Sequence, residues 1–314
     1  SLGIRLTTSS KNFSTLNAVI RTKVFIKNLL YYNLLLGKMI NKEHLDNIKN
    51  LALDYSNAAP FKHVVFNKFL NDKIYDDVSK EFNLSKSNTM AYKHFSQDKY
   101  ALTDVQEMGA QTQKLINFLA SKECISYLER VTGINNLKFD PSLHNGGLHE
   151  TRRNGHLTLH RDFNTHPHHP KWRRRINIII YLNEIWKEEW GGSLELWDDK
   201  RKNCLRKVSP TKNKCILFDT TNSFHGYPDP IKCPEDITRK SLAIFYFTEE
   251  EKNLKSISTF YTTRSSDSVA RKLIIFFDRQ LVKIYSFLLR RFKIKNKTIE
   301  KLLLFFFRNK NDTK

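Results

Sequence analysis

A histidine and an aspartate two positions apart are the first residues of this sequence whose types and spacing could do chemistry. They are His160 and Asp162, in the segment GHLTLHRDFN, which has the composition of a β-strand. Alternate side chains of a strand lie on one face, so we expect His160 and Asp162 to point one way and Leu157 and Leu159 the other. An imidazole and a carboxylate that reach the same point suit a divalent transition metal.

A His-x-Asp pattern is weak evidence alone, because His44 and Asp46 repeat it in this chain. That pair lies in a segment with helical patterning, where positions two apart do not face each other, so we interpret it as accidental. The candidate second histidine is His225 in FDTTNSFHGYPDP, which follows the strand-like KCILFDT. Two histidines and one carboxylate leave coordination positions open, as is typical of non-heme Fe(II) oxygenases.

An arginine and a serine that share a strand face follow 14 residues after His225. They are Arg239 and Ser241 in TRKSLAIFYF. A buried guanidinium beside a hydroxyl binds a carboxylate well, because its planar fork can form two parallel hydrogen bonds. The alternative is an arginine on an edge strand, held in an ordinary salt bridge. The sequence around Arg239 leaves both interpretations open.

These residues lie in a part of the chain that reads as short strands. The chain has 314 residues, of which 40% are hydrophobic, so it can bury a sizeable core. From Asn136 onward, runs such as GHLTLH, RINIIIYLN, SLELWD, CILFDT and KSLAIFYF alternate with Gly, Pro and Asn. Short strands without helices between them predict a sandwich or jelly roll rather than a parallel sheet.

The preceding part of the chain has mainly helical patterning. We expect a helical stretch around residues 42–55, a short strand around His63–Phe66, an amphipathic helix after it, and a helix over Thr112–Arg130. The apolar positions of the amphipathic helix are Phe69, Leu70, Ile74 and Val78. No Cys-x-x-Cys pair is present, so the four cysteines are expected to be free thiols in a reducing compartment.

The net charge of +21 is concentrated at the two ends of the chain. Residues 1–50 hold 8 basic and 2 acidic residues, residues 264–314 hold 14 and 4, and the 213 residues between them hold 31 and 26. A strongly basic groove in the central part is therefore not required, which counts against nucleic acid as the partner.

The C-terminal tail is a basic amphipathic segment. Its apolar residues recur at helical spacing: Leu273, Phe276, Phe277, Leu281, Ile284, Leu288 and Phe292. Such a helix either lies on an anionic membrane surface or packs its apolar face on the catalytic domain or a second protomer, and we favour packing. The run LLLFFF at residues 302–307 also needs cover.

Taken together, the motifs resemble those of the prolyl 4-hydroxylase-like Fe(II)/2-oxoglutarate dioxygenases. The resemblance covers roughly residues 140–250 and rests on GGLH, HRDFN, RRINIIIYLNEIW, WGGSLELW, SFHGYPDP and RKSLAIFYF in this order. PFKHVVFNKFL also resembles the lead-in segment of bacterial members. The family implies an α+β fold with a mainly β core: a double-stranded β-helix, or jelly roll, with flanking helices, here followed by a helical C-terminal tail.

The resemblance also implies roles for the candidate residues. His160, Asp162 and His225 correspond to the iron ligands, and Arg239, helped by Ser241, to the partner of the distal carboxylate of 2-oxoglutarate. Tyr181 matches the position whose phenol reaches that carboxylate, and Asn177 shares its strand face. The cofactors implied are Fe(II) and the cosubstrate 2-oxoglutarate, with ascorbate as an accessory reductant. The spacing from His225 to Arg239 is longer than in many relatives.

The expected domain organisation has three parts. Residues 1–50 form a basic helical extension, residues 51–263 the dioxygenase domain, with a helical lead-in over 51–139 and a jelly-roll core over 140–250, and residues 264–314 the basic helical tail. The predicted activity is hydroxylation of an unactivated C–H bond, on a prolyl or other protein side chain or a small molecule, using dioxygen and releasing succinate and carbon dioxide. The alternatives are a nucleic-acid-directed oxygenase and a catalytically silent β-helix binding module.

The chain has no evident cleavable signal peptide and no apolar run near the length of a membrane span. The predicted location is the cytoplasm, with peripheral membrane contact through the tail as the alternative.

Overall fold

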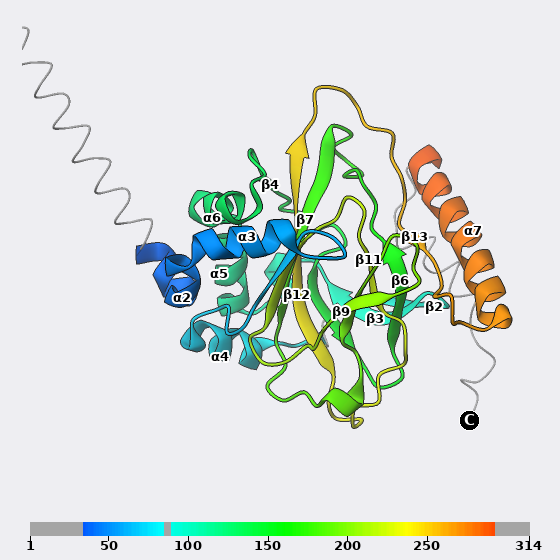
Figure 1. Ribbon diagram of the computed structural model, residues 1–314, viewed down its shortest axis with the longest axis horizontal. Coiled ribbons are helices and arrows are strands. Elements are labelled where there is room, and N and C mark those ends of the chain that lie inside the picture. Colours follow the sequence, from blue (N-terminus) through cyan, green and yellow to red (C-terminus); the bar gives the residue numbers. More distant parts are fainter. Residues whose placement is uncertain (1–33, 85–88, 293–314) are drawn as a thin grey trace, which may run out of the picture.

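A single antiparallel sheet, curled into a jelly roll, forms the centre of the molecule (Figure 1). The computed structural model describes residues 34–84 and 89–292. The strands run in the order β1-β10-β7-β12-β5-β3-β6-β11-β8-β9, with β13 on β6, β2 on β3 and β4 on β12. The strands are β1 (His63–Phe66), β2 (Met90–His94), β3 (Gln97–Leu102), β4 (Lys138–Phe139), β5 (Gly147–Thr151), β6 (His156–Arg161), β7 (Trp172–Tyr181), β8 (Leu194–Trp197), β9 (Cys204–Val208), β10 (Cys215–Asp219), β11 (Phe224–Tyr227), β12 (Arg239–Glu249) and β13 (Phe260–Tyr261). The predicted double-stranded β-helix with flanking helices is confirmed.

Helices from the first part of the chain cover one outer face of the sheet (Figure 1). They are α2 (Lys42–Asp46), α3 (Ile48–Asn57), α4 (Asp72–Glu81), α5 (Ala110–Leu119) and α6 (Lys122–Thr132). Short 3-10 turns occur at Val105–Glu107, before α5, and at Glu188–Trp190, between β7 and β8. A further helix, α7 (Val269–Phe292), lies at the opposite side of the molecule, next to β13.

The alternation along β7 shows how the sheet separates two interiors. Ile176, Ile178 and Ile180 belong to the core beneath the helices, together with residues such as Leu115 and Tyr127. Asn177 and Ile179 point to the other face and line the cavity inside the roll. A strand buried on both faces needs apolar residues at successive positions, which explains the run of isoleucines.

Two segments that periodicity alone joins into single helices are each divided into two. The helix predicted over Thr112–Arg130 is two helices that meet at Ala120 and Ser121, where the Ser121 hydroxyl accepts a hydrogen bond from the backbone N–H of Cys124 at 3.2 Å. The stretch around 42–55 likewise divides at Asn47. The predicted single helix over Thr112–Arg130 was therefore wrong in its continuity.

The amphipathic helix after β1 begins later than its apolar pattern indicates. α4 begins at Asp72, after the cap residue Asn71, so Phe69 and Leu70 precede it and are buried in the core as extended residues. The strand at His63–Phe66 and the four free cysteines are confirmed. The predicted tail helix is present as α7, whereas residues 1–33 and the run at 302–307 lie outside the described residues.

The domain boundaries remain predictions. The boundary at residue 50 falls within α3, and Leu36, Met39 and Ile40 pack in the main core before it.

One extra residue in β6 sets the position of the first candidate ligand. His225 of β11 pairs with His160, but Tyr227, two residues further, pairs with Leu157, three residues earlier. This bulge brings both His160 and Leu157 to the cavity, so the expectation that Leu157 points away was wrong. Leu159 does lie on the outer side, where it packs with Trp197 and Phe224.

Gly226 allows the bulged strand to approach β11 closely. A Cβ atom on Gly226 would lie 2.7 Å from the carbonyl oxygen of Leu157 and 2.9 Å from that of Thr158. Both distances are shorter than side chains tolerate, and both involve backbone atoms, which cannot turn away as a side chain could. The glycine is therefore required by the approach of β6 rather than by its own backbone conformation.

We predict that Gly226→Ala separates β6 from β11 and moves His160 away from His225. The free energy of unfolding should fall by about 1–3 kcal/mol, the cost typical of overpacking, and the affinity for divalent metal should fall with it. Urea denaturation and metal titration measure the two effects. Gly37→Ala is the control: its Cβ would meet only Leu45 Cδ1 at 4.0 Å, so metal affinity should stay unchanged, and the free energy of unfolding should not fall but rise by up to about 1 kcal/mol, because Gly37 lies in a helical segment. Unchanged metal affinity in Gly226→Ala would contradict this account.

Candidate metal centre and its cavity

Three predicted side chains from two strands and the loop after one of them meet inside the roll. Donor atoms of His160, Asp162 and His225 lie within 4.8 Å of one another, and they form the only such group of three or more His, Cys, Asp or Glu among the described residues. His160 comes from β6, Asp162 follows directly after that strand, and His225 lies opposite His160 on β11. The side chains are 7%, 11% and 4% exposed, so bulk water has little access to them.

The hydrogen bonds of the two imidazoles fix which nitrogen faces the centre. Nδ1 of His160 lies 3.0 Å from the carbonyl oxygen of Thr158, and Nδ1 of His225 lies 3.1 Å from that of Ser223. Because a carbonyl only accepts, each Nδ1 donates, and each Nε2 keeps its lone pair. These Nε2 atoms lie 3.6 Å and 3.8 Å from the Asp162 carboxylate, too far for hydrogen bonds.

The donor set therefore fits a divalent transition metal. Two imidazole lone pairs and one carboxylate converge, and Oδ2 of Asp162 is buried without a hydrogen-bond partner. This oxygen lies in an ion pair with Arg174 but has no well-aligned hydrogen bond, so a carboxylate lone pair remains available to a metal. Burial lowers the pKa of His225 to about 4, so its imidazole is neutral at physiological pH, as a ligand must be.

Arg174 is the residue of this centre that the sequence did not reveal. Its Nη1 lies 3.1 Å from Oδ2 of Asp162, and its side chain is 1% exposed. The contact is an ion pair with poor hydrogen-bond alignment, since neither atom has a well-formed hydrogen bond. Burial would raise the pKa of Asp162, but the positive charge of Arg174 outweighs it and holds that pKa well below the usual range.

Aromatic rings hold the guanidinium of Arg174 in place. Its Cζ lies 3.4 Å from the ring centroid of Phe163 and 3.7 Å from that of Phe245, so the cation is held against two aromatic faces. Burial lowers the pKa of Arg174 to about 10, which leaves the group charged at neutral pH.

A second bulge explains why Arg174 faces inward. Phe245 of β12 pairs with Asn177, whereas Phe247, two positions further along β12, pairs with Arg174, three positions away along β7. The extra residue is Arg175, and it reverses the alternation of the strand. A basic residue at the start of an apolar strand was the available signal, but simple alternation places Arg174 on the side opposite Asn177.

The predicted carboxylate clamp is buried in the same cavity. Arg239 is 4% exposed, and its Nε donates to the carbonyl oxygen of Gly192 at 2.8 Å. The guanidinium also lies over the ring of Tyr227, 4.2 Å from its centroid. The alternative of an edge-strand salt bridge is excluded by position, because β12 lies between β7 and β5 and Arg239 has no ion pair among the described residues.

Of the remaining predicted residues, two line the cavity and one lies behind its lining. Ser241 and Asn177 line the cavity, and Oδ1 of Asn177 is buried without a hydrogen-bond partner. Tyr181 does not line the cavity; its hydroxyl accepts a hydrogen bond from Nη2 of Arg239 at 3.3 Å and so supports the clamp from behind. Tyr227, in the SFHGYPDP motif, is a lining residue that the sequence analysis did not single out.

The other cavity walls are aromatic and carry one further cation. Tyr92, Phe245 and Tyr261 contribute rings, and Lys99 reaches the cavity from β3. Asp162 is the only acidic side chain among the lining residues, against the two cations Lys99 and Arg239. The lining is therefore suited to anionic ligands bound beside a metal.

The histidine-rich loop after β6 is not a second metal site. His166 is buried, and its Nε2 lies 3.2 Å from Asp140, whereas His168 and His169 are exposed. No group of three metal-binding side chains involves this loop among the described residues. Its buried member packs between Trp172 and Phe247 and contributes to the wall behind Arg174.

Comparison with known proteins identifies the same segment. Residues 146–247 match the family model described as the 2OG-Fe(II) oxygenase superfamily, which confirms the resemblance found in the sequence. That range contains the metal-site residues, Arg174 and the clamp. No curated protein matches the chain.

Similar solved structures include two prolyl hydroxylases. One is the Trichoplax adhaerens prolyl hydroxylase in complex with a hypoxia inducible factor peptide, at 17% identity and a TM-score of 0.48 over 66% of this chain and 93% of that one. The other is a Pseudomonas putida prolyl-4-hydroxylase, at 13% identity and a TM-score of 0.43 over 63% and 99%.

We predict that Arg174→Met destabilises the metal-free protein by about 3–5 kcal/mol, because it leaves a buried carboxylate unpaired. Saturating Mn(II) should reduce this difference, since the metal supplies the missing positive charge. Urea denaturation with and without Mn(II) measures both effects. Arg173→Met is the control: its partner Glu250 and its own side chain are both about one-third exposed, so the loss should be below about 1 kcal/mol.

The same pair gives a pH dependence of defined sign. The pKa of Asp162 is lower in the folded protein than the value of about 3.9 in an unfolded chain. The stabilisation from ionised Asp162 is therefore fully present at neutral pH and disappears as the pH falls below about 4. The stability difference between wild type and Arg174→Met should narrow over that range, and a constant difference would contradict the assignment.

Proposed function

We propose that this chain, which contains a segment of the 2OG-Fe(II) oxygenase superfamily, is an Fe(II)- and 2-oxoglutarate-dependent dioxygenase that hydroxylates an unactivated C–H bond. The observation that carries the proposal is the convergence of His160, Asp162 and His225 in the cavity that Arg239 also lines. When bound there, iron and the 2-oxo acid supply the oxidising chemistry, with succinate and carbon dioxide as products.

The protein's own residues position the reactants and exclude water. His160, Asp162 and His225 would hold the metal through three neighbouring donors, and as only three protein ligands they would leave coordination positions for other ligands. Arg239 binds the distal carboxylate of 2-oxoglutarate with Nη1 and the second N–H of Nη2, which the contacts to Gly192 and Tyr181 leave free. Because this arginine is held by a strand, a carbonyl and two tyrosine rings, it needs little reorganisation to bind the cosubstrate.

We also propose a prolyl or other protein side chain as the substrate group. The sequence resemblance is to prolyl 4-hydroxylase-like enzymes, and the walls formed by Tyr92, Phe245 and Tyr261 suit a compact apolar side chain. Asn145 and Thr259 lie among these lining residues and offer polar groups that could orient a peptide backbone.

The activity is tested by succinate formation from 2-oxoglutarate with Fe(II), dioxygen and ascorbate. Wild-type protein should release succinate slowly without a substrate, and Asp162→Ala should release none because the metal loses its only carboxylate ligand. Omission of ascorbate tests whether this enzyme needs the reductant. Wild-type protein that binds neither metal nor 2-oxoglutarate would overturn the proposal and favour a silent binding module.

The clamp assignment gives a separate prediction. Arg239→Met should raise the KM for 2-oxoglutarate about 10- to 100-fold, the loss typical of hydrogen bonds to a charged group, while metal affinity stays nearly unchanged. Steady-state kinetics and metal titration distinguish the two. Arg153→Met is the matched control, because Arg153 is exposed, donates only to the carbonyl oxygen of Cys233 at 2.8 Å, and does not line the cavity.

A further inference from the structure

The helix α7 shows its apolar face to the solvent rather than to the catalytic domain. Among the residues of α7 with described side chains, Ile275 and Asp278 are the two buried against the domain, at 3% and 5% exposed. Residues two apart on a helix lie on nearly opposite sides, so Leu273 and Phe277, on either side of Ile275, point outward. We expected this apolar face to pack on protein, but within the described residues the domain does not cover it.

The outward face is broad and continuous along the helix. Its members are all large and apolar, and each is 39–72% exposed: Val269, Leu273, Ile274, Phe276, Phe277, Leu281, Ile284 and Phe287. A contiguous apolar surface of this kind marks an interaction site on a folded protein. Among the described residues, no helix combines the length and apolar character that crossing a bilayer requires.

The charges of α7 identify the kind of partner. Among its 24 residues are six basic ones and a single acidic one, Asp278. Asp278 faces the domain and is paired with His94, whose Nδ1 lies 3.1 Å from its carboxylate. The outer surface of the helix therefore carries basic and apolar residues without a negative charge.

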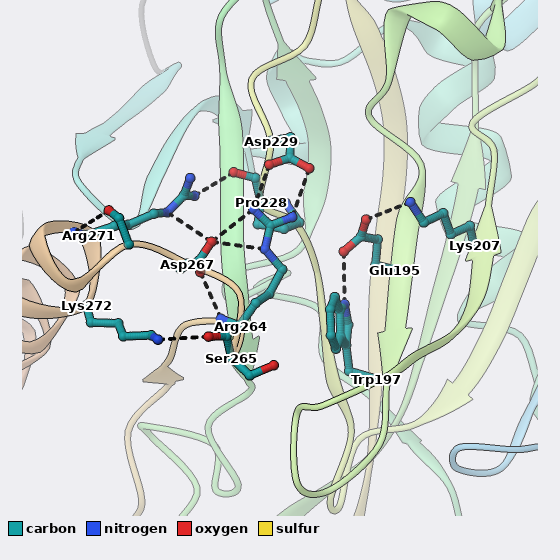
Figure 2. A network of polar contacts seen from close by, with 11 residues as sticks. Glu195, Trp197, Lys207, Pro228, Asp229, Arg264, Ser265, Asp267, Arg271 and Lys272 are labelled. Carbon is teal, nitrogen blue, oxygen red and sulfur yellow. Dashed lines mark hydrogen bonds and ion pairs between the residues drawn. The ribbon is translucent and has the colours of Figure 1, made fainter.

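Anchoring contacts at the start of α7 leave its positive charge largely uncompensated. Figure 2 shows Arg264 between Asp229 and Asp267, which fixes the turn before the helix. Arg271 and Lys272 donate to the backbone carbonyls of Pro228 and Ser265 at 2.6 Å and 2.8 Å. A carbonyl carries no net charge, and the nearest carboxylate to Arg271 lies 4.0 Å away in Asp267, already paired with Arg264.

We infer that the outer face of α7 binds the surface of an anionic membrane, with the helix lying in the plane of the interface. Its aromatic and aliphatic side chains enter the boundary between headgroups and acyl chains, and its basic residues contact anionic headgroups. The proposal does not depend on the dioxygenase activity.

Charge complementarity favours this occupant over other parts of the same protein. A second copy would place another helix with six basic residues against the first, so like charges would meet. Residues 1–33 contain five basic and no acidic residues, so they are no better matched. An anionic lipid surface supplies both an apolar layer and the missing negative charge.

Vesicle sedimentation of the full chain tests the inference. Wild-type protein should bind phosphatidylcholine vesicles containing about 30% phosphatidylserine at least about tenfold more tightly than pure phosphatidylcholine vesicles, and raised salt should weaken the binding. Lys283→Glu, at an exposed position on α7, should reduce the preference for phosphatidylserine. Equal binding to both vesicle types would overturn the anionic assignment.

A matched pair of substitutions locates the contact. Phe277→Asp should reduce vesicle binding at least about tenfold, whereas Leu53→Asp on α3 should not, although the two side chains are 62% and 59% exposed. Thermal melting checks that both variants remain folded. If wild type binds no vesicles and light scattering shows a dimer that Phe277→Asp dissociates, a second copy covers this face and the proposal is wrong.

Discussion

The carboxylate of Asp162 must be negatively charged while it is nearly cut off from water, and much of the site is arranged around this requirement. Burying such a charge alone is prohibitively costly, so it needs a permanent cation close by. Arg174 supplies one, at 3.1 Å, and keeps its own charge because two phenyl rings and the carboxylate surround its guanidinium. The negative charge of Asp162 is therefore balanced in the metal-free protein as well.

The geometry that satisfies this requirement comes from two single-residue insertions in neighbouring parts of the roll. The bulge in β6 places His160 beside His225, and the bulge in β7 turns Arg174 toward Asp162. Each bulge depends on a particular residue. Gly226 lets the backbone of β6 come close to β11, and the side chain of Arg175, the extra residue of β7, donates a hydrogen bond to Thr248 at 3.3 Å. Bulges beside a functional site are thus the means by which a regular sheet presents irregularly spaced side chains.

The same bulges separate what the sequence could predict from what it could not. His160, Asp162 and His225 were identifiable because their residue types and the strand-like segments around them are both visible in the sequence. Arg239 was identifiable because Ser241 and an apolar strand follow it. Arg174 was missed and Leu157 was misjudged, because a period of two carries no information about where one residue is inserted. The helix division at Ser121 was missed because a hydroxyl cap interrupts the backbone without interrupting the apolar pattern. The outward orientation of α7 was missed because amphipathicity shows that a helix has two faces, but not which one meets the domain.

A short chain of contacts joins the attachment of α7 to the lining of the cavity. His94 donates to Asp278 of the helix, and its other ring nitrogen lies 3.0 Å from the side-chain amide of Gln97, which lines the cavity. The ring of His94 also meets Tyr261, which in turn lies against His160. Coupling between two binding events is reciprocal: whatever factor one ligand imposes on the affinity of the other is returned unchanged. If a cavity ligand moved this short chain of contacts, it would change the affinity of α7 for its proposed partner, and the partner would change the affinity of the ligand by the same factor. The affinity measured for one would then depend on whether the other is bound.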